Sequence, residues 1–267
     1  MLTSLRKAFS VFDVFTLEAP EWGLADLSGK LRIPKPTLHH ILTTLVEGGW
    51  VAQDPKTKRY RLGVRLWEKG WLAVNQLGLR ELARPCVEAL AETSQETVHL
   101  AILDVVDPGY VVYIDKIESQ HPVRAYSMIG GRAPSYCVAT GKAILGFNPD
   151  VAKRLLRTRL HAYTQFTLAD PNRLTRDLGA TQKRGFSINQ GEYRDDVTGV
   201  AAPIRNHEGQ VVSAVGISGP SYRLPARVIQ RIAPTVVVTA QEISTKMGFL
   251  ERSERGAAGL RLRGAPA

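Results

Sequence analysis

The sequence predicts an α+β protein with an N-terminal winged helix-turn-helix, a helical linker and a C-terminal α/β domain. Its 267 residues exceed the usual size of one domain, so two domains are expected. Apolar residues at helical spacing precede a basic hairpin pattern, and strands mixed with helices follow from about residue 97. The expected division is residues 1–63, a linker at 64–92, residues 93–251, and a disordered basic tail at 252–267.

The composition is that of an ordinary soluble protein, with 44% apolar and 22% charged residues. No run of eighteen apolar residues is present, so no membrane span is expected. The first residues lead into an amphipathic pattern instead of a signal-peptide core, which indicates a cytoplasmic protein. Cys86 and Cys137 lie far apart and form no metal-ligand spacing, so neither a disulfide framework nor a metal site is expected. No cofactor is expected either.

The net charge of +10 is concentrated at the two ends of the chain. Residues 1–80 hold 12 basic and 7 acidic residues, and residues 252–267 hold four arginines and one glutamate. The stretch between them carries a net charge of only +2. A polyanionic partner is therefore expected to contact the N-terminal part.

Three short helices are expected in the N-terminal part. They cover residues 4–15 with Ser4 as N-cap, residues 24–31, and residues 36–47 ending at Gly48. The tight turn at residues 32–34 joins the last two, which is the helix-turn-helix arrangement. The second helix of such a pair enters the DNA major groove with its N-terminal residues at the base edges. These candidate DNA-contacting residues are Lys35, Pro36, Thr37, His39 and His40.

A basic β-hairpin is expected directly after these helices. Residues 50–53 and 58–63 alternate on both sides of a Pro-containing turn at residues 54–57. The second strand carries Lys58, Arg59 and Arg61 around a tyrosine, and such a wing would add salt-dependent affinity that is largely independent of sequence. Alternatively, these basic residues only form a solvated surface, which is the more frequent role of a charge run by itself. Adjacent histidines such as His39 and His40 point in different directions and lack further ligands, so they predict no metal site.

The segments that form these helices and this hairpin resemble the IclR family of bacterial regulators. The residues that carry the resemblance are 4–8, 24–27, 33–39, 54–55 and 58–63. The resemblance implies DNA contacts at Lys7, Arg32, Lys35, Thr37 and His40, with the wing residues Lys58 and Arg59 beside them. Pro36 stands where the family more often has Ser, and His40 where it often has Arg, so an unusual operator preference is expected.

The linker at 64–92 is expected to be helical, with Pro85 near the start of its second helix. Trp67 and Trp71 are spaced i, i+4 and form an aromatic stripe. Burial inside the chain and burial against a second copy are both compatible with this stripe. A dimer would place two recognition helices about 34 Å apart and require a palindromic operator.

Residues 97–251 predict strands and helices in an order typical of a sensor domain. The expected strands are 97–103, 110–117, 123–126, 200–203 and 211–218, and the expected helices are 140–145, 151–156, 173–183 and 227–247. The resemblance to the IclR family continues through residues 131–134, 139–143, 184–186, 191–192, 200–204 and 215–220. It implies a GAF-like effector-binding domain and covers nearly the whole chain.

The same resemblance implies which residues contact a small-molecule effector. They are Tyr136, Cys137, Ala139, Asn189, Gly199, Gly216 and Ser218. Gly199 and Gly216 replace polar side chains of members that bind small oxoacids, and Asn189 stands where Asp is frequent. Two missing side chains would enlarge the pocket, which favours an aromatic or sugar-derived organic acid. Alternatively, the glycines serve only close strand packing.

Three functions of different classes compete. The leading hypothesis is a ligand-responsive transcriptional regulator, a repressor or activator of a catabolic operon that binds double-stranded DNA as a dimer or tetramer. The second is a small-molecule hydrolase that uses Cys137 as nucleophile, but no Cys/His or Ser/His/Asp constellation accompanies it. The third, a nonspecific DNA-binding protein, leaves the sensing domain unexplained.

Overall fold

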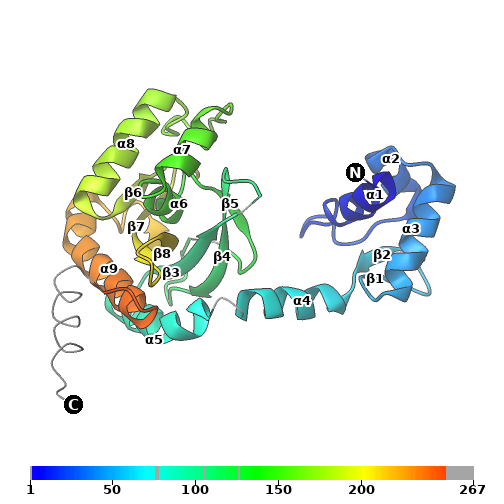
Figure 1. Ribbon diagram of the computed structural model, residues 1–267, viewed down its shortest axis with the longest axis horizontal. Helices are drawn as coiled ribbons and strands as arrows, with labels where there is room; N and C mark the ends of the chain where they lie inside the picture. Colours follow the sequence, from blue (N-terminus) through cyan, green and yellow to red (C-terminus); the bar gives the residue numbers. More distant parts are fainter. Residues whose placement is uncertain (1, 76–77, 105, 126, 251–267) are drawn as a thin grey trace, which may run out of the picture. The chain divides into compact units, whose positions relative to one another are not determined.

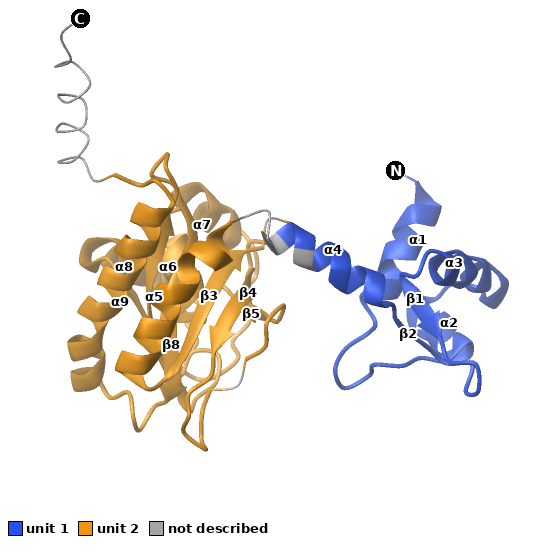
Figure 2. Cartoon of the chain, turned by 90° about the horizontal axis from the view of Figure 1, so that it is seen from below, with its two compact units in different colours: residues 1–77 blue, residues 78–267 orange. Residues whose placement is uncertain are grey.

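The computed structural model describes residues 2–75, 78–104, 106–125 and 127–250. The chain forms two compact units, residues 1–77 and residues 78–267 (Figure 2). The predicted tail at 252–267 lies outside the described residues.

Unit 1 begins with the three predicted helices, which are α1 (Thr3–Phe12), α2 (Leu24–Leu31) and α3 (Lys35–Glu47). Their apolar faces meet around the buried residues Leu27, Leu38 and Leu42. The prediction of Ser4 as N-cap was wrong, because α1 starts one residue earlier after Leu2, and no side chain among the described residues caps it. The same helix ends at Phe12 instead of residue 15.

The predicted hairpin follows as β1 (Val51–Gln53) and β2 (Tyr60–Leu62), paired antiparallel. Its turn is held by Asp54, whose Oδ1 accepts from the backbone N–H groups of Lys56 at 2.8 Å and Thr57 at 2.7 Å. These two bonds stabilise the carboxylate and lower the pKa of Asp54. Backbone hydrogen bonds between Trp22 and Tyr60 attach the hairpin to the segment before α2.

The predicted linker comprises two helices that belong to different units. Helix α4 (Val64–Asn75) lies in unit 1, and α5 (Leu79–Ser94) lies in unit 2. Pro85 lies inside α5 and not near its start, because α5 already begins at Leu79. Trp67 is 67% exposed, whereas the side chain of Trp71 lies outside the described residues.

Unit 2 contains a six-stranded antiparallel sheet in the order β5-β4-β3-β8-β7-β6. The strands are β3 (Thr97–Leu103), β4 (Tyr110–Ile117), β5 (Arg132–Pro134), β6 (Ser187–Gln190), β7 (Val197–Arg205) and β8 (Val211–Pro220). The strand predicted at 123–126 is absent from residues 123–125, and residue 126 lies outside the described residues. The three- and four-residue edge strands β5 and β6 escaped prediction because they are too short to show alternation.

Helices cover both faces of this sheet (Figure 1). The helices are α6 (Ala139–Leu145), α7 (Pro149–Leu156), α8 (Pro171–Arg184) and α9 (Ala226–Lys246). Helix α6 packs on the face that carries Ala101, Ala201 and Ala214, and small residues there allow the close approach. Helices α5 and α9 pack together against the sheet, and α7 and α8 lie outside α6. No helix in the described part of the chain is long and apolar enough to cross a membrane.

Candidate DNA-binding surface and effector site

Helix α3 separates its residues into a buried and an exposed face. Leu38 and Leu42 have no exposed surface, because they lie at i and i+4 and face α1 and α2. The predicted contact residues Lys35, Thr37, His39 and His40 are all exposed. Thr43, which the sequence patterns did not indicate, is also exposed and lies one turn after His39 and His40. Its hydroxyl donates to the carbonyl of His39 at 2.9 Å.

The turn between α2 and α3 exposes the side chain of Arg32. Arg32 adopts the left-handed conformation with φ 55°, which ends α2 and leaves the Arg32 side chain exposed. Ser28 donates its hydroxyl to the carbonyl of Ile33 at 2.6 Å and so holds the turn. Lys7 is half-buried on α1.

The wing presents more basic residues than the resemblance implied. Lys58 lies at the turn with φ 57° and is exposed, and Lys56 and Arg61 are exposed as well. Arg59 has a structural bond in addition, because its Nη2 donates to the carbonyl of Glu21 at 2.9 Å. The wing can therefore offer several cations to a phosphate backbone, while Arg59 also ties the wing to the segment before α2.

The exposed histidines of α3 do not form a metal centre with other residues of the described chain. The rings of His39 and His40 lie 6.4 Å apart at 80° to each other. No group of three His, Cys, Asp or Glu among the described residues could hold a metal ion.

The predicted effector residues of the sheet share one face, which α6 covers. Gly199 pairs with Ser218 and with Asn189, and Gly216 pairs with His99. Side chains of directly paired residues point to the same face of a sheet. A Cβ placed on Gly199 would lie 3.4 Å from the Ser218 Cβ and 3.7 Å from the Ala139 Cβ. The structure thus brings Ala139, Gly199 and Ser218 together.

The two glycines have little room for a side chain. A Cβ on Gly216 would lie 2.6 Å from the carbonyl oxygen of Val200 and 2.5 Å from the Ala201 Cβ. At Gly199 it would lie 2.9 Å from the carbonyl oxygen of Ile217. Backbone atoms cannot give way easily, so the geometry favours the close-packing alternative at both positions over an enlarged pocket.

A buried histidine that the sequence analysis missed lies beside Ser218. His99 is 4% exposed, and its Nε2 lies 2.6 Å from the Ser127 Oγ while its Nδ1 lies 3.4 Å from the Ser218 Oγ. Burial, together with the nearby ammonium of Lys116, lowers the pKa of His99 to about 3. The imidazole is therefore neutral at physiological pH, with one nitrogen able to donate and the other able to accept.

Two further polar side chains continue this cluster toward α6. The Tyr113 ring lies 4.8 Å from the His99 ring, and burial raises the pKa of Tyr113 to about 12, so its hydroxyl stays protonated. Thr140, in the first turn of α6, is 5% exposed, and its hydroxyl has no hydrogen-bond partner with good geometry among the described residues. Neutral hydroxyl and imidazole groups next to apolar walls are typical of small-molecule sites.

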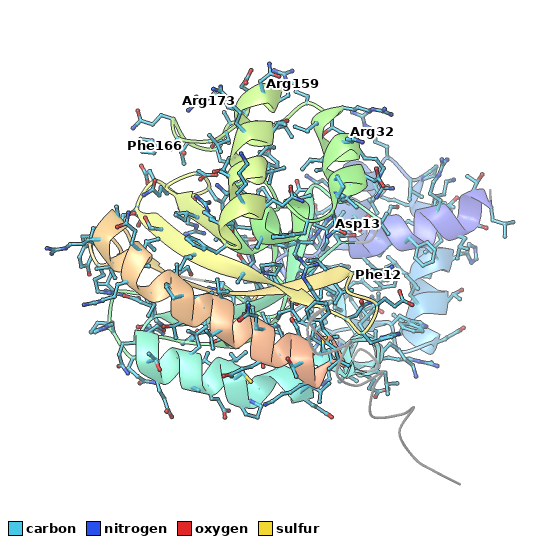
Figure 3. The ribbon with its side chains drawn as sticks, turned by 60° about the vertical axis from the view of Figure 1, so that its left-hand side comes forward. Phe12, Asp13, Arg32, Arg159, Phe166 and Arg173 are labelled. Carbon is cyan, nitrogen blue, oxygen red and sulfur yellow. The ribbon has the colours of Figure 1, made fainter. Side chains whose placement is uncertain are left out.

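The remaining two predicted effector residues lie on the opposite side of α6. Tyr136 and Cys137 pack with α7 and α8. The Tyr136 hydroxyl donates to the carbonyl of His161 at 3.0 Å and accepts from its N–H at 2.9 Å, so it anchors the loop after α7. In Figure 3 Arg159, Phe166 and Arg173 lie at the outer end of this region.

Cys137 has the environment of an inert thiol. It has no exposed surface, and burial, with a contribution from the Glu192 carboxylate, raises the pKa of the thiol. No histidine donates to or accepts from its Sγ in the hydrogen bonds of the described chain. A protonated thiol without a base is a poor nucleophile, so this environment disfavours a hydrolase that uses Cys137.

Helix α6 is anchored at its other end by a buried ion-pair cluster. Lys142 is fully buried, and its Nζ lies 2.6 Å from the Glu192 Oε1 and 3.0 Å from the Asp177 Oδ2. Burial raises the pKa of Glu192, an effect that the Lys142 ammonium opposes. The cluster joins α6 to α8 and to the segment after β6, and thereby fixes the position of Ala139 and Thr140 over the sheet.

Comparison with known proteins agrees with both halves of this arrangement. A family model for the IclR helix-turn-helix domain matches residues 4–55, and a model for the bacterial transcriptional regulator IclR C-terminal domain matches residues 71–245. The chain belongs to the IclR family of transcriptional regulators. It is therefore a DNA-binding regulator of a family whose members respond to ligands.

Relatives cover the chain almost from end to end. The chain is 30% identical to the HTH-type transcriptional regulator XynR of Escherichia coli K12, over 93% of this chain and 98% of XynR. It is 31% identical to the transcriptional repressor IclR of the same organism, over 84% and 82% of the two chains. An IclR homolog from Microbacterium hydrocarbonoxydans, solved in complex with 4-hydroxybenzoate, matches with a TM-score of 0.78 at 25% identity, over 92% of this chain and 99% of that one. The IclR of Thermotoga maritima matches with a TM-score of 0.73 at 27% identity, over 93% and 100%.

Proposed function

We propose that this IclR-family regulator binds a palindromic operator as a dimer or a dimer of dimers and controls a catabolic operon in response to a small organic acid. The observation that supports it most is the group of neutral polar side chains of His99, Ser218 and Thr140 beneath α6. The same chain carries an N-terminal domain with exposed basic residues. The DNA-binding domain would be residues 1–63, the dimerising linker residues 64–92, and the sensor domain residues 93–251.

An aromatic acid is the effector class that these groups favour. The Tyr113 and His99 rings lie 4.8 Å apart at 39° to each other and offer aromatic surface, and the hydroxyls of Ser218 and Thr140 can donate hydrogen bonds to a carboxylate. The Lys116 ammonium near His99 is paired with the Glu118 carboxylate at 2.7 Å, so hydroxyl donors and not a free cation would hold the carboxylate. The related structure with 4-hydroxybenzoate supports the same class.

DNA recognition is assigned to α3 for sequence reading and to the wing for phosphate contacts. Thr37 and His40 lie exposed on α3, and Lys58 lies exposed on the wing. Lys58→Ala is expected to weaken binding to operator and random DNA alike and to reduce the salt slope by about one. Thr37→Ala is expected to weaken operator binding more than random binding.

Dimerisation is assigned to α4. Val64 is 73% exposed, Trp67 67% and Leu72 44%, so this helix presents apolar surface that the rest of unit 1 does not cover. Trp67→Ala is expected to weaken dimer formation in sedimentation experiments. An unchanged dimer would contradict the assignment of α4 while leaving the DNA-binding proposal intact.

Footprinting with and without candidate ligands tests the whole proposal. A protected palindrome whose occupancy changes with an aromatic acid such as 4-hydroxybenzoate is the expected result. Lys153→Ala is the control for Lys58→Ala, because it also removes an exposed lysine but lies on α7 in unit 2. It is expected to leave the footprint unchanged. Uniform coating without a protected palindrome would contradict the proposal, and glyoxylate or pyruvate binding more tightly than any aromatic acid would contradict the effector class.

A further inference from the structure

A pocket lies in unit 2, lined by α8, β7 and α9 and away from the residues beneath α6. Its volume is about 600 Å³, within the range of small-molecule sites. Helices α8 and α9 lie next to each other in both ribbon views (Figures 1 and 2).

All charged side chains among the described residues that line this pocket are cationic. Lys183, Arg184 and Arg205 contribute three cations, and the described residues that line the pocket include no Asp or Glu. The nearest carboxylate to Arg184 is that of Asp177, 4.0 Å from its Nη2, and Asp177 is also paired with Lys142. The pocket therefore carries a positive field that its own lining does not neutralise.

Arg205 is the residue that points most clearly to a ligand. Its guanidinium carbon lies 4.9 Å from the centroid of the Phe147 ring and 5.8 Å from that of the Phe249 ring, so the guanidinium packs on two aromatic side chains. Its Nη1 donates to the carbonyl of Gly209 at 2.9 Å, but no carboxylate among the described residues pairs with it. Burial without a counter-ion lowers the pKa of Arg205. A held guanidinium with unused N–H groups is suited to bidentate recognition of a carboxylate.

The cations on α8 have a second explanation that does not extend to Arg205. Lys183 and Arg184 occupy the last turn of α8, where cations interact favourably with the helix dipole. Arg184 also donates from Nε to the carbonyl of Phe186. Arg205 ends a strand instead, so neither a helix dipole nor an ion pair in the described chain accounts for its charge.

The apolar part of the lining limits the class of ligand. Val237, Ala240, Ala202 and Pro203 supply apolar surface beside the cations. We propose that this pocket is a second small-molecule site, distinct from the proposed effector site, that binds an organic anion with a flat apolar body. The carboxylate would meet Arg205 and Lys183, and the apolar body would lie against α9 and β7.

Calorimetric titration of the full chain with phthalate, with its uncharged diamide as control ligand, tests this site. Phthalate is expected to bind at about millimolar concentration or more tightly, and the diamide is expected to bind far more weakly. Arg205→Gln is expected to weaken phthalate binding roughly ten- to a hundredfold, because it removes a charge-assisted hydrogen bond. Arg176→Gln, which removes an exposed arginine of α8 that does not line the pocket, is expected to leave phthalate binding unchanged.

A second pair of variants covers the case in which Arg205→Gln does not fold. Lys183→Glu inverts an exposed charge at the pocket, and Lys153→Glu makes the same change on α7 outside it. Phthalate affinity is expected to fall severalfold in the first and to stay constant in the second.

Absence of phthalate binding to the wild-type chain would overturn the second site. Binding that responds to Ser218→Ala, in the proposed effector site, and not to the pocket variants would overturn it as well, and would leave the proposed effector site standing. Equal losses in Lys183→Glu and Lys153→Glu would show a general charge effect and would also overturn it.

Discussion

Replacement of His99 by glutamine is expected to remove a defined part of the acid sensitivity of unit 2. The folded pKa of His99 is about 3, against an ordinary value of 6.5. A group with a depressed folded pKa contributes stability that is complete above its unfolded pKa and is lost as the pH falls toward its folded pKa. The His99 contribution should therefore decline from about pH 7 downward.

The size of this decline follows from the two pKa values. At pH 7 about a quarter of the unfolded chains carry a proton at this histidine and at pH 5 nearly all do, whereas the folded chain takes up almost none. With about 1.4 kcal/mol for each unit of pH, the free energy of unfolding should fall by about 2 kcal/mol over this range from His99 alone. Glutamine keeps a donor and an acceptor for Ser127 and Ser218 but does not titrate.

Urea unfolding at pH 7, 6 and 5, followed by circular dichroism, measures this contribution. The wild-type chain is expected to lose about 2 kcal/mol more than His99→Gln between pH 7 and pH 5. His121→Gln is the control, because the His121 side chain is exposed and stays in water in both states. Parallel pH profiles for the wild type and His99→Gln would refute the argument that burial holds the imidazole neutral.

Three further predictions concern the cores and the buried thiol. Lys142→Met should lower the free energy of unfolding by about 3–5 kcal/mol, because it leaves the carboxylates of Glu192 and Asp177 without their buried partner; a melting temperature within error of the wild type would contradict this. Leu38→Ala should cost about 2–5 kcal/mol in the core of unit 1, measured by urea unfolding, and a smaller loss would mean that this core can collapse around the gap. Cys137 should resist iodoacetamide in the folded chain at pH 8 and react only in urea, whereas rapid labelling without urea would restore the hydrolase alternative.

The helices and the hairpin of unit 1 were largely predictable, because the sequence patterns that indicate them are local. Apolar residues at i, i+3 and i+4 predicted all three helices, Gly48 predicted the end of α3, and the Pro-containing turn predicted the wing. The failures were local as well: α1 starts after Leu2 without a cap, so the serine at position 4 had no role at its start. Cap residues are weak signals, because packing of the apolar face against α3 decides where a short helix begins.

The proposed effector site was predictable only in part, because its members come from distant strands. The resemblance identified Ala139, Gly199 and Ser218, which the structure brings together. It did not identify His99, whose position beside Ser218 depends on the pairing of β3 with β8. The hydroxyl of Tyr136 bonds to the loop after α7, and the contact of Tyr136 with an effector stays a prediction.

Sequence by itself determined the order of the main elements, the exposed polar face of α3 and the family, because periodicity, turns and motifs depend on residues that are neighbours in the chain. Tertiary structure alone decided which polar groups meet beneath α6 and why Gly216 has no room for a side chain. It also decided that Arg205 packs on two phenylalanine rings without a carboxylate partner in the described chain. These features depend on strand register and helix packing, which place residues far apart in the chain within a few ångströms of each other.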